Sequence, residues 1–281
     1  MKILVLGYKG MLGTDLVATL DGAHDVIGKD VEDFDIASAS DCRDIINESG
    51  ADVVINAAAY TNVDGCETDE AGCFSVNGDG VKNVALACRE TGSKLIHFST
   101  DYVFDGTKTL PYVEDDACNP INAYGRSKLK GEEYLRESSD NYILLRTSWL
   151  YGKNGKNFVG AIVEKAEKTG ALEVVDDQTG SPTCTVDLAA AVKVLVEGDY
   201  RGIFHVTNRG TCNWYQFALK ILEYRDIKDV NIVPIKSATL GRGAPRPEYS
   251  VLSCRKFADA THKTMRFWQI ALKDYMERLA Q

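Results

Sequence analysis

The chain has 281 residues, of which 44% are hydrophobic, a composition typical of a folded protein with one large or two modest domains. Its formal net charge of −9 argues against nucleic acids and anionic membranes as partners, because both attract clustered positive charge. No apolar run approaches the roughly 20 residues of a membrane span, and the run Ile3–Leu6 is too short for a signal peptide. We therefore expect a cytoplasmic protein that binds small molecules.

Eight cysteines are scattered singly along the chain: Cys42, Cys66, Cys73, Cys88, Cys118, Cys184, Cys212 and Cys254. The sequence has no Cys-x-x-Cys pair and only four histidines. This pattern fits neither a zinc site nor a disulfide framework. We expect each cysteine to be reduced and mostly buried.

The N-terminus has the pattern of a strand, a glycine turn and a helix. The β-rich run Lys2–Leu6 leads directly into Gly7, Gly10 and Gly13, and residues 14–20 have helical spacing. Glycines at these positions permit a tight turn and let backbone N–H groups approach a pyrophosphate, while the helix N-terminus supplies partial positive charge. The stretch predicts a dinucleotide-binding turn, and a purely structural turn is the alternative.

A second predicted strand, residues 25–29, ends at Asp30, which lies 20 residues beyond Gly10. A carboxylate at this distance is typical of a residue that binds the ribose hydroxyls of a dinucleotide. This carboxylate favours NADH. Lys29 and Arg43 instead favour NADPH, because a cation attracts its 2′-phosphate. The sequence therefore leaves the choice between NADH and NADPH open.

Residues 52–59 predict a third buried strand, which ends in three alanines. Such small side chains leave room for a flat cofactor, and simple close packing of strand on helix is the alternative. A long helix is predicted from about residue 68 to residue 91, and its internal glycines favour a kink. Asn77 marks either this kink or a solvent-facing position.

The apolar run Lys94–Phe104 predicts a fourth buried strand, which stops in Ser99, Thr100 and Asp101. Ligands of open α/β sheets bind at the carboxyl ends of the strands. We therefore expect these polar side chains to face a ligand.

A helix is predicted to begin at Asn122, and it places Tyr124 and Lys128 four residues apart on one face. A nearby cation lowers the pKa of a tyrosine, so this pair suits acid/base chemistry at neutral pH. A second Tyr-x-x-x-Lys pair, Tyr224 with Lys228, has no hydroxyl-rich strand end at a suitable distance before it. We interpret the second pair as solvated helix surface.

A further strand is predicted over residues 142–149, with Trp149 at its end. Strands and helices alternate up to this point, which predicts an α/β fold with a Rossmann-like, doubly wound parallel sheet.

We expect residues 1–150 to form an NAD(P)-binding Rossmann domain, to which the chain returns at about residues 184–206. Residues 151–183 and 207–281 would then form a smaller, C-terminal substrate-binding domain, which includes an amphipathic helix from about Arg266.

Longer motifs narrow the prediction to one family. They are Asn56–Asp64, Phe98–Gly106, Arg146–Gly152, Asp177–Thr183 and Arg246–Leu252. Together with the glycine turn, Thr100, Tyr124 and Lys128, these motifs resemble the extended short-chain dehydrogenase/reductase superfamily and, within it, the dTDP-4-dehydrorhamnose reductases. The resemblance runs from residue 1 to about residue 280.

The resemblance implies hydride transfer from NADPH or NADH to dTDP-4-dehydro-6-deoxy-L-mannose (dTDP-6-deoxy-L-lyxo-4-hexulose), which gives dTDP-L-rhamnose. The implied catalytic residues are Tyr124 as proton donor, Thr100 as a second hydrogen-bond donor, and Lys128. The implied cofactor-binding residues are Gly7, Gly10, Met11, Leu12, Gly13, Asp30, Asp35, Ile36, Ala58, Ala59, Tyr60, Thr61, Tyr124 and Lys128. The implied substrate-binding residues are Thr61, Val63, Thr100, Asp101, Tyr102 and Trp149. From charge alone we add Arg246 and Lys156 as candidate contacts of the diphosphate.

Other functions stay open at this stage. One is another reductase, epimerase or dehydratase of nucleotide sugars, although no glutamate follows Asp101 to complete the usual acid/base pair of a dehydratase. Another is a non-catalytic regulatory subunit of the methionine adenosyltransferase type, and a third is a purely structural interaction protein. Some relatives form a Mg²⁺-linked dimer, so a monomer or a homodimer is expected and Mg²⁺ dependence stays open. The residues assign no metal ligands.

Overall fold

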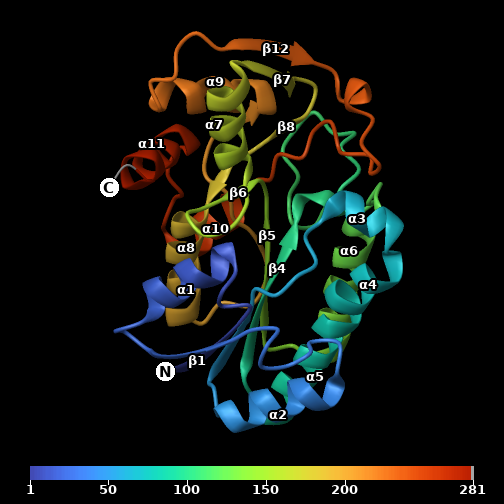
Figure 1. The fold of residues 1–281 in the computed structure, drawn as a ribbon. Coiled ribbons are helices and arrows are strands. Elements are labelled where there is room, and N and C mark those ends of the chain that lie inside the picture. Colours follow the sequence, from blue (N-terminus) through green and yellow to red (C-terminus); the bar gives the residue numbers. More distant parts are fainter. Residues whose placement is uncertain (280–281) are drawn as a thin grey trace.

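The computed structural model describes residues 1–279 of the chain. The bounds of the main strands are β1 Lys2–Leu6, β2 Asp25–Lys29, β3 Val53–Asn56, β4 Lys94–Thr100, β5 Tyr142–Thr147 and β10 Gly202–His205. These six strands form one parallel sheet in the order β10-β5-β4-β3-β1-β2 (Figure 1). Because β1 pairs with both β2 and β3, the strand order reverses beside β1, which is where open α/β sheets bind ligands. The predicted parallel sheet is confirmed.

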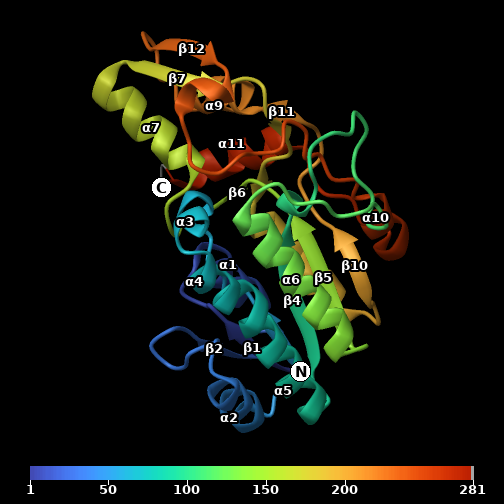
Figure 2. The same ribbon diagram turned by 90° about the vertical axis from the view of Figure 1, so that its right-hand side faces the viewer.

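Helices cover both faces of the sheet (Figures 1 and 2). They are α1 Met11–Leu20 and α8 Thr185–Glu197 on one face, and α2 Ala39–Ser49, α5 Gly80–Thr91 and α6 Ala123–Ser138 on the other. The alternation of side chains along β1 supplies both cores, because Ile3 and Val5 pack toward α1 and α8, whereas Leu4 and Leu6 pack toward α2 and α5. Burial on both faces explains why this strand is continuously apolar.

The long helix predicted over residues 68–91 is present from Glu70 to Thr91, and a break at Asp69 separates it from a further short helix. The chain forms α3 Val63–Thr68, α4 Glu70–Phe74, a π-helical turn Ser75–Asp79 and then α5. The break follows Asp69, whose side chain caps α4 by accepting a hydrogen bond from the Gly72 amide at 3.0 Å. Asn77 lies in the π-helical turn and is 1% exposed, so it marks the kink and does not face solvent.

Cys66 of α3 and Cys73 of α4 form a disulfide, with 5.4 Å between their Cα atoms. The expectation that every cysteine is reduced is therefore wrong at these two positions. The pairing was not visible in the sequence, because it depends on the break at Asp69 that folds α4 back beside α3. The other cysteines are free, and Cys42, Cys88, Cys184 and Cys212 are buried as expected.

Most of the remaining elements gather beyond the carboxyl ends of the sheet strands, whereas one helix, Arg255–Thr261, packs against the edge strand β10 (Figures 1 and 2). The remaining elements are β6 Leu150–Tyr151, α7 Phe158–Thr169, β7 Ala171–Val175, β8 Thr179–Gly180, β9 Thr183–Cys184, β11 Cys212–Asn213, α9 Trp214–Tyr224, β12 Asn231–Ile235, α10 Arg255–Thr261 and α11 Trp268–Leu279. Most of them share a core that includes Tyr151, Phe217, Trp268 and Tyr275 and is separate from the two cores that flank the sheet. None of the helices within residues 1–279 is both long and apolar enough to cross a membrane.

Reduction of the Cys66–Cys73 disulfide should lower the free energy of unfolding by about 2.5 kcal/mol, the loop-entropy value for a closed loop of roughly eight residues. Urea unfolding followed by circular dichroism, with and without a dithiol reductant, measures the difference. A Cys66→Ala/Cys73→Ala double variant is the control, because its unfolding midpoint should not respond to the reductant. Equal midpoints for the oxidised and reduced wild-type protein would contradict the assignment.

Candidate active site

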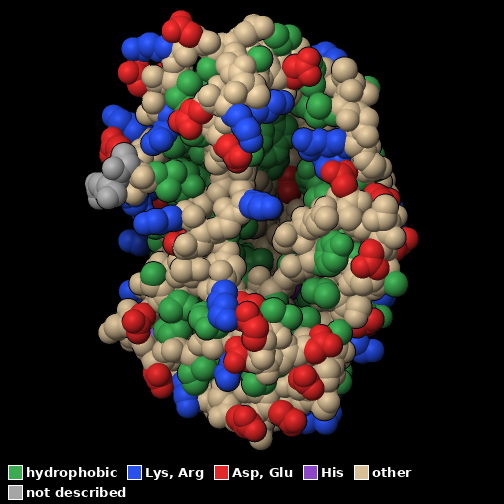
Figure 3. All heavy atoms as spheres, viewed as in Figure 1, with side chains coloured by type: hydrophobic (Ala, Val, Ile, Leu, Met, Phe, Trp, Pro, Cys, Tyr) green, Lys and Arg blue, Asp and Glu red, His purple; other side chains and the backbone are tan. Residues whose placement is uncertain are grey.

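A cleft of about 590 Å³ opens at the carboxyl ends of the sheet strands. In the space-filling view it is a deep hollow across the middle of the molecule, with Lys and Arg side chains along its upper rim (Figure 3). Many of the residues expected from the sequence line it: Gly10, Met11, Leu12, Gly13, Ala59, Thr61, Val63, Thr100, Asp101, Tyr102, Tyr124, Lys128, Lys156 and Trp149. The sheet therefore brings together side chains from four separate strand ends.

A second hollow of about 310 Å³ adjoins the cleft, since Gly10 and Ala59 line both. The expected residues that line it are Gly7, Gly10, Asp30, Asp35, Ile36, Ala58 and Ala59. Two expected site residues line neither hollow, namely Tyr60 and Arg246.

The glycine turn leaves the N-terminus of α1 open to a ligand. Gly10 is the N-cap of α1 and no side chain caps this helix, so its first backbone N–H groups have no side-chain acceptor. Gly7 has a φ of 79°, and a Cβ there would lie 2.8 Å from the Ala58 nitrogen, so only glycine fits. This turn fits a pyrophosphate, and Asp30 lies in the adjoining hollow where an adenosine ribose would follow.

Tyr124 lies in the first turn of α6, as the sequence predicted. The Asn122 side chain caps this helix by accepting a hydrogen bond from the Gly125 amide at 2.7 Å. Thr100, at the end of β4, lines the cleft together with Tyr124, and the ring of Tyr102 packs edge-on against Tyr124 with 6.0 Å between centroids. A phenol and a hydroxyl therefore converge in the cleft.

Lys128 lies one turn further along α6 and is 2% exposed. Its ammonium donates a hydrogen bond to the Phe98 carbonyl oxygen at 2.6 Å and lies 3.4 Å from Nε2 of His97. Burial lowers the pKa of Lys128 to about 8, partly offset by Glu132. Burial also lowers the pKa of His97, which leaves the imidazole neutral at pH 7.

The expectation that Lys128 lowers the pKa of Tyr124 is wrong for this structure. Burial, reinforced by the nearby Asp101 carboxylate, raises the pKa of Tyr124 to about 12, although the hydrogen bond with Thr100 acts in the opposite direction. The ammonium is bonded to the Phe98 carbonyl, and desolvation of the phenol outweighs it. The phenol is therefore neutral at pH 7 and is a proton donor.

Asp101 is 2% exposed, and its Oδ1 accepts a hydrogen bond from the Thr100 hydroxyl at 3.0 Å. Its Oδ2 has no hydrogen-bond partner among the described residues. Burial raises the pKa of Asp101 to about 7, and hydrogen bonds with Ser250 and Thr100 reduce the shift. An unpartnered carboxyl oxygen facing the cleft is suited to a hydroxylated ligand.

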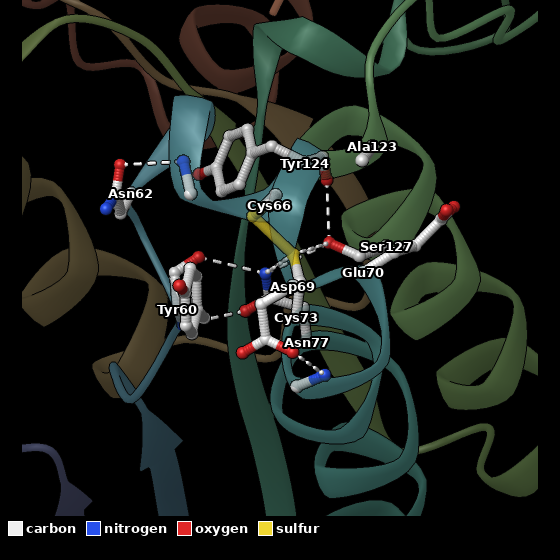
Figure 4. The surroundings of a disulfide bond; sticks show 12 residues. Tyr60, Asn62, Cys66, Asp69, Glu70, Cys73, Asn77, Ala123, Tyr124 and Ser127 are labelled. Atoms are coloured by element: carbon white, nitrogen blue, oxygen red, sulfur yellow. Dashed lines mark hydrogen bonds between the residues drawn. A yellow bond between two sulfur atoms is a disulfide. The ribbon is translucent and has the colours of Figure 1, made fainter. Parts of the chain in front are cut away.

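A network that the sequence did not predict holds the loop after β3 against α6 (Figure 4). The Asn77 side chain accepts a hydrogen bond from the Tyr60 amide and donates one to the Tyr60 carbonyl oxygen, both at 2.9 Å. Its Nδ2 also donates to the Ser127 hydroxyl at 3.0 Å, and that hydroxyl donates to the Tyr124 carbonyl oxygen at 2.8 Å. Tyr60 thus contributes its backbone to the site. The glycines around Asn77 were the only signal in the sequence.

Trp149 stacks on Trp214 with 3.5 Å between ring centroids, and both rings line the cleft. Sequence analysis missed Trp214, which begins α9. A capping box formed by Asn213 and Gln216 marks this helix start and was readable from the sequence. The two indoles give the cleft a broad apolar wall.

Arg246 is paired with a carboxylate in the described structure. Its Nη1 and Nη2 donate to Oδ1 and Oδ2 of Asp64 at 3.0 and 2.8 Å. Its guanidinium is therefore already bound to a carboxylate, and Arg246 does not line the cleft, although the sequence suggested it as a diphosphate contact.

The family model described as the RmlD substrate binding domain matches residues 1–281. The chain belongs to the RmlD substrate binding domain family. This result confirms the resemblance to dTDP-4-dehydrorhamnose reductases.

Three relatives illustrate the similarity. A crystal structure of a dTDP-4-dehydrorhamnose reductase from Clostridium acetobutylicum is 41% identical, with a TM-score of 0.96 and complete coverage of both chains. The dTDP-4-dehydrorhamnose reductase of Bacillus anthracis, solved in complex with NADP, is 35% identical, with a TM-score of 0.96 and coverage of 99% of this chain and 100% of that one. A dTDP-4-keto-6-deoxy-D-glucose reductase of Streptomyces niveus is 38% identical over 96% of this chain and 94% of its own length.

The raised pKa of Asp101 predicts that Asp101→Asn stabilises the protein above pH 7. The folded state binds the Asp101 proton more tightly than the unfolded state, so the stability from this group is complete below pH ~4 and is lost as the pH rises to about 7. Asparagine has no such loss, so its advantage should reach on the order of 4 kcal/mol at pH 8 and vanish toward pH 4.

Urea unfolding at pH 4, 6 and 8 measures this dependence. Asp105→Asn is a control of opposite sign, because backbone hydrogen bonding, chiefly from Thr107, lowers the pKa of Asp105 to about 2. That variant should be less stable than wild type at pH 7, and the difference should disappear as the pH falls. A pH-independent difference for Asp101→Asn would refute the assigned cause.

Proposed function

We propose that this chain reduces dTDP-4-dehydro-6-deoxy-L-mannose (dTDP-6-deoxy-L-lyxo-4-hexulose) to dTDP-L-rhamnose with NADPH or NADH. One observation carries the proposal: Thr100, Tyr124 and Lys128 converge in a cleft that is continuous with the glycine turn. The similarity to dTDP-4-dehydrorhamnose reductases over the full chain supports the substrate.

The nicotinamide cofactor, when bound, supplies the hydride to C4 of the sugar. Negative charge develops on the carbonyl oxygen during this transfer, so proton and hydrogen-bond donors are needed there. Tyr124, a neutral phenol at pH 7, donates the proton, and Thr100 donates a second hydrogen bond. Lys128 would hold the nicotinamide ribose with its ammonium, which also donates a hydrogen bond to the Phe98 carbonyl oxygen.

The sugar lies between two unlike sides of the cleft in this proposal. Asp101 presents its unpartnered oxygen to the sugar hydroxyls, while the indoles of Trp149 and Trp214 face the 6-methyl edge. Thr61, Val63 and Tyr102 line the same cleft and complete the pocket. Residues 1–150 with 184–206 would then serve as the cofactor domain, and residues 151–183 with 207–281 as the nucleotide-sugar domain.

We infer a preference for NADH over NADPH from the charges around Asp30. The cations that sequence analysis considered for a 2′-phosphate are already paired, because Lys29 lies 3.8 Å from Asp33 and Arg43 lies 3.1 Å from Glu90. Asp30 itself holds the turn by accepting a hydrogen bond from the Lys9 amide at 2.9 Å. A 2′-phosphate would meet a carboxylate here, and the neighbouring cations Lys9, Lys29 and Arg43 each already lie beside another carboxylate.

A second candidate substrate is dTDP-4-keto-6-deoxy-D-glucose, on which the Streptomyces niveus relative acts by its name. The catalytic residues act on either ketone, so only the sugar pocket distinguishes them. We further propose that the protein works in the cytoplasm as a monomer or homodimer. No three His, Cys, Asp or Glu side chains of residues 1–279 cluster as metal ligands, and Mg²⁺ dependence is a matter for assay.

Purified protein should oxidise NADH or NADPH on addition of the L-lyxo-4-hexulose substrate and release dTDP-L-rhamnose, as measured by absorbance at ~340 nm and by sugar stereochemistry. Tyr124→Phe should lower kcat by ~10²–10⁴-fold with little effect on cofactor affinity, because it removes one transferable proton and almost no volume. Tyr224→Phe is the matched control and should keep wild-type kcat, since Tyr224 lies at the end of α9, away from the cleft.

Turnover of the D-glucose ketone alone would move the assignment to the second substrate and leave the reductase chemistry intact. Turnover of neither ketone with either cofactor would overturn the proposed function.

Asp30→Ala should weaken NADH binding by roughly tenfold, because it removes a hydrogen bond from a ribose hydroxyl to a charged group. NADPH binding should change less or improve, because the repulsion of the 2′-phosphate is removed as well. Fluorescence titration gives both Kd values, and Asp44→Ala, an exposed aspartate of α2, is the control. Equal weakening of both cofactors would show that Asp30 does not set the preference.

A further inference from the structure

Trp149 and Trp214 form an apolar side of the cleft, which we call the indole wall. Their ring planes differ by only 8° and their centroids are 3.5 Å apart, so the two rings stack face to face. Both side chains line the same cleft as Thr100 and Tyr124. The Phe158 ring packs against Trp214 as well, with 4.5 Å between centroids. A ligand in the cleft therefore meets a flat apolar surface, provided that both indoles keep their positions.

Trp149 depends on its neighbours for its position. Its φ of 48° is a backbone conformation that a bulky residue rarely adopts. Its ring lies directly on the backbone of Gly180, where an added Cβ would be 2.5 Å from Cε2 of the indole. The ring of Trp214 covers it by stacking. Trp149 therefore keeps its orientation only while Trp214 stays in place.

Trp214 is oriented by a hydrogen bond from its side chain. Its Nε1 donates to Oε1 of Gln178 at 3.2 Å. An indole has this one donor and no acceptor, so the amide of Gln178 must present its oxygen to the ring. Gln178 is 5% exposed and lines neither the cleft nor the adjoining hollow. It can therefore act on a ligand only through Trp214.

The backbones that carry these two side chains are joined independently of the hydrogen bond. β8, Thr179–Gly180, pairs antiparallel with β11, Cys212–Asn213. Gln178 comes directly before β8, and Trp214 comes directly after β11. The ladder therefore keeps the two residues adjacent, while the hydrogen bond between their side chains determines how the indole ring is turned.

The two candidate ketones differ in the part of the sugar that meets an apolar wall. The L-lyxo ketone and the D-glucose ketone have opposite configurations at C3 and C5, and C5 carries the methyl group. With the C4 carbonyl and the ring placed alike, the two methyl groups lie on opposite sides of the ring. A methyl group in a hydrophobic pocket changes affinity roughly 10- to 200-fold. A wall in a fixed position therefore separates the two epimers, whereas a mobile wall adapts to both.

We propose that Gln178 is a positioning residue that sets the selectivity between these epimeric ketones. By accepting the Trp214 N–H it keeps Trp214 stacked on Trp149, and the fixed indole wall then favours the methyl group of one epimer. This proposal rests on the proposed function for the identity of the ketones. Gln178 touches neither the sugar nor the cofactor.

The indole N–H signals in nuclear magnetic resonance test the first step without turnover. The chain has three tryptophans, so a ¹⁵N-labelled sample gives three such signals, which Trp149→Phe and Trp214→Phe assign. Gln178→Met keeps the length of the side chain and removes the acceptor. The Trp214 signal should then move because its hydrogen bond is lost, and the Trp149 signal because the ring current of the stacked indole changes. The signal of Trp268, a core residue, should stay and report an intact fold.

Gln178→Glu is the conservative variant, because it keeps an acceptor oxygen for the indole. Both cleft signals should stay near their wild-type positions in this variant. An unmoved Trp149 signal in Gln178→Met would overturn the proposal, because the stack would then not depend on Gln178.

Calorimetric titration of both ketones without cofactor measures the selectivity, since neither ketone is then turned over. In Gln178→Met the ratio of the two Kd values should shrink roughly tenfold, within the range that one methyl contact supplies. Gln178→Glu should keep the ratio within twofold of wild type. Gln269→Met is the matched control, because it makes the same chemical change in α11 at a residue that lines neither hollow. An unchanged ratio in Gln178→Met, or an equal loss for both ketones, would overturn the proposal.

A double-mutant cycle tests the route from Gln178 to the cleft. Trp214→Phe keeps an aromatic ring and lacks the N–H, so Gln178 has no donor left to accept from. In that background, Gln178→Met should change the Kd ratio by less than twofold. A further tenfold change would show that Gln178 acts by another route and would overturn the proposal.

The same titrations separate this proposal from the proposed function. If the wild-type protein reduces the L-lyxo ketone but the Kd ratio is unchanged in Gln178→Met, the selectivity role fails and the proposed function stands. If the wild-type protein binds neither ketone, the proposed function fails and the selectivity role fails with it, whatever the indole signals show.

Discussion

One hydrogen bond, from the Lys128 ammonium to the Phe98 carbonyl oxygen at 2.6 Å, fixes the catalytic helix on the sheet. β4 ends at Thr100, two residues beyond Phe98, and Tyr124 lies one turn before Lys128, so this bond sets the distance between hydroxyl and phenol. The buried ammonium is stabilised by the carbonyl dipole and the neutral His97 ring. Without it, the two groups that face the substrate oxygen would depend on contacts made elsewhere along α6.

The next turn of α6 carries a second fixed point. The Glu132 carboxylate binds Arg146 of β5 through two hydrogen bonds of 2.9 and 2.7 Å, and both side chains are almost fully buried. Removal of either partner would leave a buried charge without compensation, which is strongly destabilising. Successive turns of α6 are therefore attached to adjacent strands β4 and β5, while the Asn77 network attaches the loop after β3. The cleft is rigid along the sheet because three strand ends are tied to one helix.

Local patterns predicted the sheet, the glycine turn and the Tyr124–Lys128 pair, because each depends on spacing within a few residues. Contacts between distant residues were beyond such reasoning. Asp64 and Arg246 are 182 positions apart, and Trp149 meets Trp214 only after α9 has packed over the cleft. The prediction of a lowered pKa for Tyr124 was wrong for a related reason. The sequence shows that a cation is nearby, but only the fold shows that the phenol is buried, and this burial raises the pKa.

The Trp149 backbone and the Asp101 carboxyl are both locally unfavourable. Trp149 has a φ of 48°, a strained value for a bulky residue, and Asp101 is buried with one oxygen unpartnered. Such strain is typical of functional sites, where stability is given up for binding. Laboratory evolution for heat resistance would therefore select against the residues that face the sugar, and a thermostable variant obtained without an activity screen would lose Asp101 early.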